Sequence, residues 1–113
     1  MDDETIRELF EAFGPVSIRR MFGGKGIYRD GLIFALVLRD ELMLKGDELN
    51  APEWEREGAA RWTYQNSKGK PVAMPYWSAP VDVLEDRDGL TSWAREAFSA
   101  ALRAEQAKRG PDV

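Results

Sequence analysis

The sequence of 113 residues predicts an α+β domain, an antiparallel β-meander with an N-terminal and a C-terminal helix packed on one face. Apolar residues recur at helical spacing near both ends, over residues 6–13 and 90–102. Between them, residues 32–38 form an apolar run directly after Asp30-Gly31, a strong signal for a two-residue hairpin turn. Helices at the ends and hairpins in the middle indicate one mixed domain.

The first half of the chain is expected to form one helix and four strands. The helix covers about residues 3–13 and stops at Gly14-Pro15. Gly23-Gly24 is expected to bend or break the chain after the first strand. The four strands are expected at residues 16–22, 25–29, 32–38 and 42–45.

The second half is expected to form a short helix, a hairpin and a long helix. Asn50 is a favourable N-cap residue for a helix that ends near Gly58. Strands at 62–65 and 72–77 flank a polar loop, and Pro71 and Pro75 place the second strand at an edge or at a bulge. The long helix carries the clearest apolar stripe, with Asp86 or Asp88 as its cap: Leu90, Trp93, Ala94, Ala97, Phe98, Ala101 and Leu102. Residues 1–105 are thus the predicted domain, and residues 106–113 a polar tail that frays.

The strand at residues 32–38 is apolar on both faces, so it is expected to be central and covered twice. Strict alternation places Leu32, Phe34, Leu36 and Leu38 on one face and Ile33, Ala35 and Val37 on the other. The helices cover one face. The second cover is either a flank of the sheet or a partner subunit, and a partner subunit would make the protein a homodimer.

The composition excludes most catalytic and metal chemistry. The chain has no histidine and no cysteine, which removes thiol nucleophiles, disulfides, histidine-based triads and the usual zinc sites. We therefore expect no enzyme, no metal and no cofactor. The acidic N-terminus is unlike a signal peptide and the longest apolar run is too short to cross a bilayer, which predicts a cytoplasmic protein.

A glycine cluster near residue 24 invites comparison with phosphate-binding loops, but its spacing fails. In the P-loop pattern the first glycine position holds Arg19, and the hydroxyl position holds Gly26. The dinucleotide pattern fails as well, because Arg29 stands where its third glycine belongs. The glycines are instead predicted to form turns or bulges, or to let another backbone approach, at Gly23, Gly24, Gly26, Asp30 and Gly31.

Basic residues gather in a part of the chain that has no acid, although the net charge is −4. The cluster comprises Arg19, Arg20, Lys25 and Arg29, and Lys68 and Lys70 lie in a second acid-free segment. One interpretation is a basic face that binds nucleic acid, with Tyr28, Tyr64, Tyr76 and Trp77 as stacking platforms. An acidic protein partner fits the same face. The alternative is that the cations are solvated or paired with the acidic first helix.

Tyr76-Trp77 stands between Pro75 and Pro80 in a stiff segment. Large aromatic side chains held this way often anchor protein interfaces. Because adjacent strand residues point to opposite faces, at most one of the two is expected in a given layer. The alternative for Trp77 is a place in the core beside the C-terminal helix.

Several motifs follow one another in a fixed order along nearly the whole chain. The longest is Arg19-Arg20-Met21-Phe22-Gly23-Gly24-x-Gly26-Ile27-Tyr28-x-Asp30-Gly31-x-Ile33-Phe34-Ala35-Leu36. The later ones are Leu42-x-Leu44-Lys45-x-Asp47, Tyr64, Tyr76-Trp77-x-x-Pro80, Leu84 and Trp93. In these motifs the chain resembles the N-terminal domain of the TfoX (Sxy) competence-regulator family, as a single-domain member.

The resemblance implies an α+β fold similar to type III secretion chaperones and a role in regulation by protein contact. The full-length family members are described as co-activators that help a cAMP-responsive regulator act on competence promoters. No catalytic residues come with the family. We therefore predict a regulatory protein that acts by protein–protein contact, with transcriptional regulation of DNA-uptake competence as the implied process. The predicted contact residues are Arg19, Arg20, Lys25, Arg29, Tyr76 and Trp77. The alternative is an accessory nucleic-acid-binding protein that uses a basic hairpin face.

Overall fold

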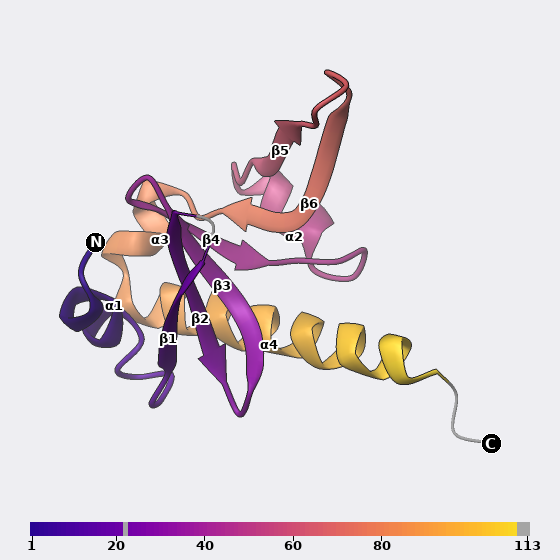
Figure 1. The fold of residues 1–113 in the computed structure, drawn as a ribbon. Helices are drawn as coiled ribbons and strands as arrows, with labels where there is room; N and C mark the ends of the chain where they lie inside the picture. Colours follow the sequence, from indigo (N-terminus) through magenta and orange to yellow (C-terminus); the bar gives the residue numbers. More distant parts are fainter. Residues whose placement is uncertain (22, 111–113) are drawn as a thin grey trace.

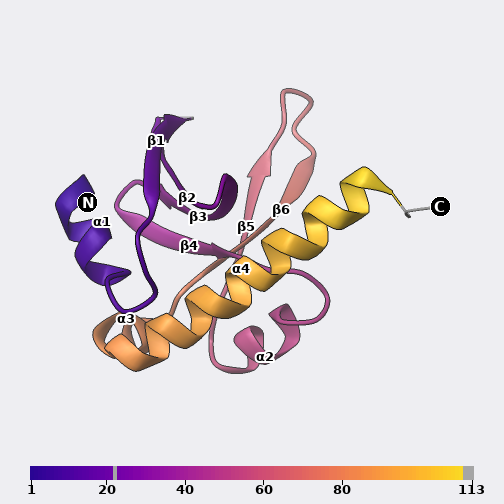
Figure 2. The same cartoon turned by 90° about the horizontal axis from the view of Figure 1, so that it is seen from below.

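The structure is a computed structural model that describes residues 1–21 and 23–110. Its elements are α1 (Asp3–Leu9), β1 (Ser17–Met21), β2 (Gly24–Arg29), β3 (Leu32–Leu38), β4 (Glu41–Lys45), α2 (Ala51–Arg56), β5 (Arg61–Gln65), β6 (Pro71–Ser78), α3 (Val81–Glu85) and α4 (Arg87–Arg109). The strands form one antiparallel sheet in the order β1-β2-β3-β4-β6-β5. All four described helices pack on the same face of this sheet, and α4 runs across it (Figures 1 and 2). The predicted α+β class is therefore confirmed.

The main core fills the space between the sheet and the helices. Ile6 of α1, Trp54 of α2 and Ala97 of α4 are fully buried there against the inner side of the sheet. The indole rings of Trp54 and Trp93 stack at 4.7 Å between centroids, which joins α2 to α4. In the described part of the chain, no helix combines the length and the apolar character that crossing a membrane requires.

The strands β1 and β2 form a tight hairpin rather than one bent strand. Met21 pairs with Gly24, which places Gly23 in the turn with a positive φ of 75°; Phe22, predicted to end the first strand, lies outside the described residues. A methyl group at Gly24 would overlap the carbonyl oxygen of Val37 on β3. The glycine therefore allows the close approach of a neighbouring backbone, as predicted.

The turn between β2 and β3 agrees with the prediction. Asp30 has a φ of 50° and Gly31 a φ of 79°, so both central residues have the positive φ that a type I′ turn requires. This conformation matches the twist of the two strands it joins.

A bulge in β3 changes which side chains share a face. Ile27 pairs with Ala35 and Tyr28 pairs with Ile33, so Phe34 has no partner on β2. Phe34 and Ala35 both point into the helix-covered core. The predicted strict alternation is therefore wrong: Leu32, Phe34, Ala35 and Val37 contact the main core, and Ile33, Leu36 and Leu38 lie on the opposite face.

The β5–β6 hairpin projects from the body of the molecule (Figure 1). Residues 76–78 of β6 pair with β4, and residues 71–73 pair with β5. The pairing with β5 shifts between Arg61 and Thr63, which leaves Pro75 in an irregular stretch of β6. The predicted place of this proline at a bulge is confirmed.

The helix boundaries differ from the predictions at four points. The helix α1 ends at Leu9, and a turn continues to Phe13. Asn50 makes no side-chain cap and is buried, where it donates to the Glu96 carbonyl at 3.1 Å. The short helix α3 was not expected. The helix α4 begins at Arg87 and continues to Arg109, past the predicted end at residue 105, while residues 111–113 of the predicted tail lie outside the described residues.

Candidate functional site

The face of the sheet that no described helix covers carries its own apolar cluster, which we call the uncovered face. Leu36, Met43 and Tyr76 form its buried centre, with exposed fractions of 3–6%. Around them lie the partly buried side chains of Met21, Ile33, Leu38, Trp62 and Met74. The curved sheet thus buries the centre of this face by itself, so the second cover predicted for β3 is a flank of the sheet. Burial of Leu36 within one chain removes the argument for a partner subunit, and the homodimer stays a prediction.

The side-chain types on the two faces differ sharply. Every phenylalanine that the structure describes lies on the helix side, as do three of the four tryptophans: Phe10, Phe13, Phe34, Phe98, Trp54, Trp77 and Trp93. Three of the four methionines lie on the uncovered face, whereas Met1 packs on the helix side.

The three tyrosines lie on the same face as these methionines. Tyr76 is in the buried centre of the uncovered face, Tyr28 contacts the sulfur of Met21 at 3.9 Å, and Tyr64 lies 5.9 Å from Trp62 between ring centroids. Met is flexible and polarisable, and Tyr combines an apolar ring with a polar tip. These residue types are more typical of a surface that contacts another molecule than of a rigid core.

A hollow of about 540 Å³ opens on this face between the β3–β4 turn and β5. Its apolar part is formed by Leu38, Met43, Trp62 and Tyr64, and Arg39 and Glu41 stand at its rim. Tyr64 is 45% exposed, a high value for a large aromatic side chain. The hollow therefore presents apolar area to solvent directly beside an edge strand of the sheet.

Two cations lie over tyrosine rings of the uncovered face. The Arg19 guanidinium is 5.3 Å from the centroid of Tyr28, and the Lys45 ammonium is 5.9 Å from that of Tyr76. Burial lowers the pKa of Lys45, with a smaller opposing effect from Glu105. Burial also raises the pKa of Tyr76 to about 12. Both groups therefore keep their neutral forms more readily than in water.

The predicted basic cluster is not one surface. Arg19 and Arg20 are neighbours on β1, so they point to opposite faces of the sheet. The Lys25 ammonium donates to the Asp3 carboxylate at 2.6 Å, which agrees with pairing to the acidic first helix, and this contact lowers the pKa of Asp3. Arg29 lies 4.4 Å from the ring of Phe13 and donates to the Phe13 carbonyl at 3.0 Å.

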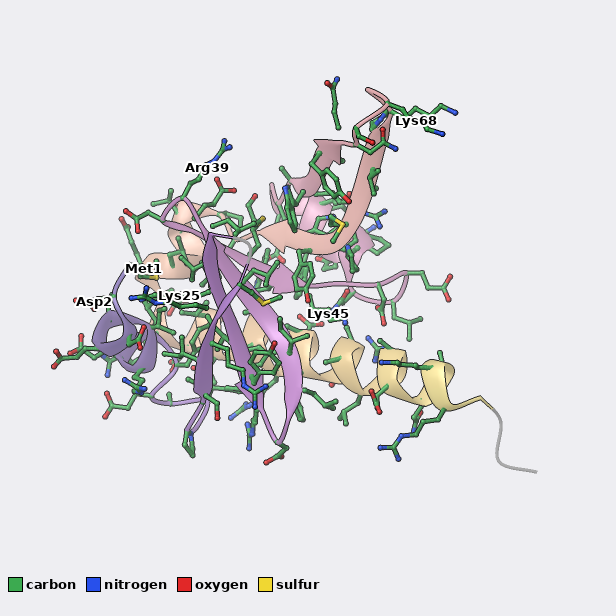
Figure 3. The ribbon with its side chains drawn as sticks, in the orientation of Figure 1. Met1, Asp2, Lys25, Arg39, Lys45 and Lys68 are labelled. Carbon is green, nitrogen blue, oxygen red and sulfur yellow. The ribbon has the colours of Figure 1, made fainter. Side chains whose placement is uncertain are left out.

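Figure 3 shows the same dispersion, with Lys25 beside Met1 near α1, Lys45 toward α4 and Lys68 at the tip of the β5–β6 hairpin. Lys25 and Arg29 thus have structural partners. Arg20 and Lys25 are cross-strand partners and line one hollow together with Arg39, so two of the four predicted cations lie side by side. Nucleic-acid binding stays a prediction.

The predicted aromatic anchors point to opposite faces, as the strand geometry requires. Tyr76 belongs to the uncovered face and Trp77 to the main core. The Trp77 indole donates to the Glu55 carboxylate at 3.0 Å, and the Arg61 guanidinium lies 4.7 Å from its ring centroid. Both side chains are buried, with 6% and 4% exposed, and their role in partner contact stays a prediction.

The residues that sequence reasoning missed are Met43 and Trp62, whereas Tyr64 was predicted as a stacking platform for nucleic acid. Their signal was the alternation along residues 41–45 and 61–65, which places one side chain in two on each face. The predicted strict alternation of β3 placed Leu36 on the same face as Phe34. Because of the bulge, Leu36 lies on the opposite face, where it packs with Met43.

A separate polar cluster fixes the far half of α4 and is structural. The Arg103 guanidinium donates to both oxygens of Asp47, at 2.6 and 3.1 Å. Hydrogen bonding from Arg103 lowers the pKa of Asp47, and the backbone amides of Leu49 and Asn50 add to this. Within residues 1–21 and 23–110, no group of three or more acids is arranged to hold a metal ion.

Comparison with known proteins bears on this architecture. The family model described as the TfoX N-terminal domain matches residues 8–101, from the last residues of α1 into α4, with every strand of the sheet between them. A search of curated proteins finds no significant match. Because the family model covers most of the 113 residues, the chain belongs to the TfoX N-terminal domain family.

Proposed function

We propose that this chain is a regulatory protein that acts by binding a protein partner through the uncovered face of its sheet. Membership of the TfoX N-terminal domain family supports a competence-related regulatory role. The resemblance that points to co-activation of a transcription regulator makes such a regulator the class of partner to test first. The observation that carries the proposal is the separation of side-chain types, with three of four methionines on the uncovered face.

The physical reason is the difference between a core and an interface. A core is stabilised by rigid side chains in fixed rotamers, and the helix-covered face has these. An interface that forms and dissociates is enriched in Tyr, Trp, Met and Arg, and these are the types at the uncovered face. Trp62 and Met74 remain only partly buried there, so their remaining apolar area is available to a partner.

The test uses two large side chains that are equally exposed. Tyr64 and Leu102 are each 45% exposed, Tyr64 on the uncovered face and Leu102 on α4. Tyr64→Ser and Leu102→Ser therefore remove similar exposed apolar area from two different places. Each variant and the wild type are used to purify partners from the native host.

We expect the partner to be retained by the wild type and by Leu102→Ser and to be lost with Tyr64→Ser. Circular dichroism spectra of the three proteins confirm that they are equally folded. A partner that both variants retain equally, or that Leu102→Ser alone loses, contradicts the proposal.

A further inference from the structure

The two edges of the sheet differ in how they resist pairing with another chain. The outer strand β1 carries Arg19 and Arg20 in its middle, and such charges discourage edge-to-edge pairing. The outer strand β5 has the sequence Arg-Trp-Thr-Tyr-Gln, whose central three residues all favour strands. Its one charge is at its first residue, and it contains no proline. Thus β5 is the unprotected edge.

The hydrogen-bond alternation of β5 shows which backbone groups are free. The amide of Asn66 donates to the Lys70 carbonyl at 2.8 Å, so these two residues form a hydrogen-bonded pair. Because hydrogen-bonded and non-hydrogen-bonded pairs alternate, Tyr64 and Val72 form a hydrogen-bonded pair with β6, whereas Gln65 and Pro71 form a non-hydrogen-bonded pair. The N–H and C=O groups of Thr63 and Gln65 therefore point to the open edge.

The hollow of the uncovered face lies directly beside this edge. Trp62, Thr63 and Tyr64 form one of its walls, and Leu38 and Met43 belong to its apolar lining. A strand added to β5 has alternate side chains on the two faces of the sheet. Every second side chain of that strand therefore lies on the same face as the hollow, where an apolar group has apolar neighbours.

The acid-free segment that contains β5 favours an acidic partner. Residues 59–81 contain Arg61, Lys68 and Lys70 and no acid. Arg39 stands at the rim, on a β3–β4 turn in which both Arg39 and Asp40 have positive φ. Figure 3 shows Arg39 and Lys68 extending away from the body of the molecule. Among the residues that line the hollow itself, Arg39 is the one cation and Glu41 the one acid, and Arg61 lies over the Trp77 ring on the helix side.

We propose that β5 captures an extended segment of the partner protein as an added β-strand, in which apolar residues that enter the hollow alternate with acidic residues. The inference rests on the proposed function and specifies its mode of binding. Backbone hydrogen bonds to Thr63 and Gln65 supply affinity, and the hollow and the cations of residues 61–70 select the sequence.

The first test is a selection of linear peptides from a random phage-displayed library against the purified chain. We expect enriched sequences in which acidic and apolar residues alternate, and no such enrichment with Tyr64→Ser as the target. Enrichment of basic sequences, or no enrichment over an unrelated control protein, overturns the inference.

The second test replaces single peptide N–H groups of the best selected peptide by N-methyl groups. In an added strand only alternate amides donate to β5, so we expect loss of binding at every second position. Affinity that falls equally at all positions, or at none, overturns strand addition. Because the change is made in the peptide, the fold of the protein is not affected.

Two protein variants complete the design. Thr63→Pro removes an outward N–H and is expected to lower peptide affinity at least tenfold. The double variant Lys68→Glu/Lys70→Glu is expected to do the same, with Lys108→Glu on α4 as the control that keeps wild-type affinity. Peptide binding that requires Tyr64 but tolerates Thr63→Pro overturns the added strand and leaves the proposed function intact. If the wild-type chain forms a dimer that Thr63→Pro abolishes, the β5 edge binds a second copy of the chain. This result also overturns the inference.

Discussion

The two faces of the sheet are made from the same strands but have different physical properties. On the helix side, Phe34 lies 5.4 Å from Phe10 and 5.1 Å from Phe13 between ring centroids, and small alanines let α4 pack closely. On the uncovered face, flexible methionines and tyrosines surround a small buried centre. The difference indicates a division of work, in which one face stabilises the fold and the other contacts a partner. The bulge at Phe34 makes this division within a single strand.

The largest expected effect comes from the centre of the helix side. Phe34→Ala removes a fully buried ring, and we expect the free energy of unfolding to fall by about 4 kcal/mol. The matched change Met43→Ala, at the buried centre of the uncovered face, is expected to cost about 2 kcal/mol because fewer neighbours surround it. Urea unfolding followed by circular dichroism measures both. Equal losses would show that the uncovered face is a second stabilising core, which contradicts the division of work.

Alkaline titration tests whether Tyr76 is buried without a partner. The folded-state pKa of about 12 lies above the usual value of 10, so the unfolded chain loses its proton first as pH rises. The corresponding stability is fully present below pH 10 and is lost between pH 10 and 12, about 2 kcal/mol in total. The free energy of unfolding measured as a function of pH shows this loss, and Tyr76→Phe is expected not to show it. A Tyr76 that ionises near pH 10 in the folded protein would contradict its burial.

The ion pair between Arg103 and Asp47 tests how much a polar contact on the helix side contributes to stability. Asp47→Asn keeps the shape of the side chain but removes its charge, and we expect a loss of about 1 kcal/mol at neutral pH. The effect is modest because the Arg103 side chain is 38% exposed and solvent screens the pair.

The pKa of Asp47 is lowered by Arg103, so the stabilisation is present above about pH 4 and disappears as pH falls through the folded-state pKa. Acid unfolding of the wild type and the variant gives the comparison. A stability difference that does not shrink in acid would show that the charge is not the cause.

The smallest expected effect on stability is at Tyr64. Because this residue is 45% exposed, Tyr64→Ser is expected to change the free energy of unfolding by no more than about 0.5 kcal/mol. Its effect on partner binding is expected to exceed tenfold, the reverse of Phe34→Ala, whose primary effect is on stability. Thermal unfolding and peptide affinity measured on the same samples make the test. A strongly destabilised Tyr64→Ser would place the residue in the core.

The sequence was sufficient for the elements whose signals are local. Asp30-Gly31 identified the turn between β2 and β3, and Pro75 identified the irregular stretch of β6. The apolar stripe that starts at Leu90 identified α4. The faces of β3 were not predictable, because the bulge depends on a pairing register with β2 that no local pattern encodes. The surroundings of the predicted contact residues were not predictable for a similar reason, and their role in partner contact stays a prediction. The charges of Lys25 and Arg29 were visible, but their partners Asp3 and Phe13 are brought to them by the tertiary fold.

The most direct test of the division between the faces uses the methyl groups of the four methionines in nuclear magnetic resonance. Met21, Met43 and Met74 lie on the uncovered face, and Met1 packs on the helix side as an internal control. On addition of a bound partner or selected peptide, we predict that signals of the first three methionines shift and that the Met1 signal does not. A shift confined to Met1, or equal shifts of all four, would contradict the assignment of the uncovered face as the binding surface.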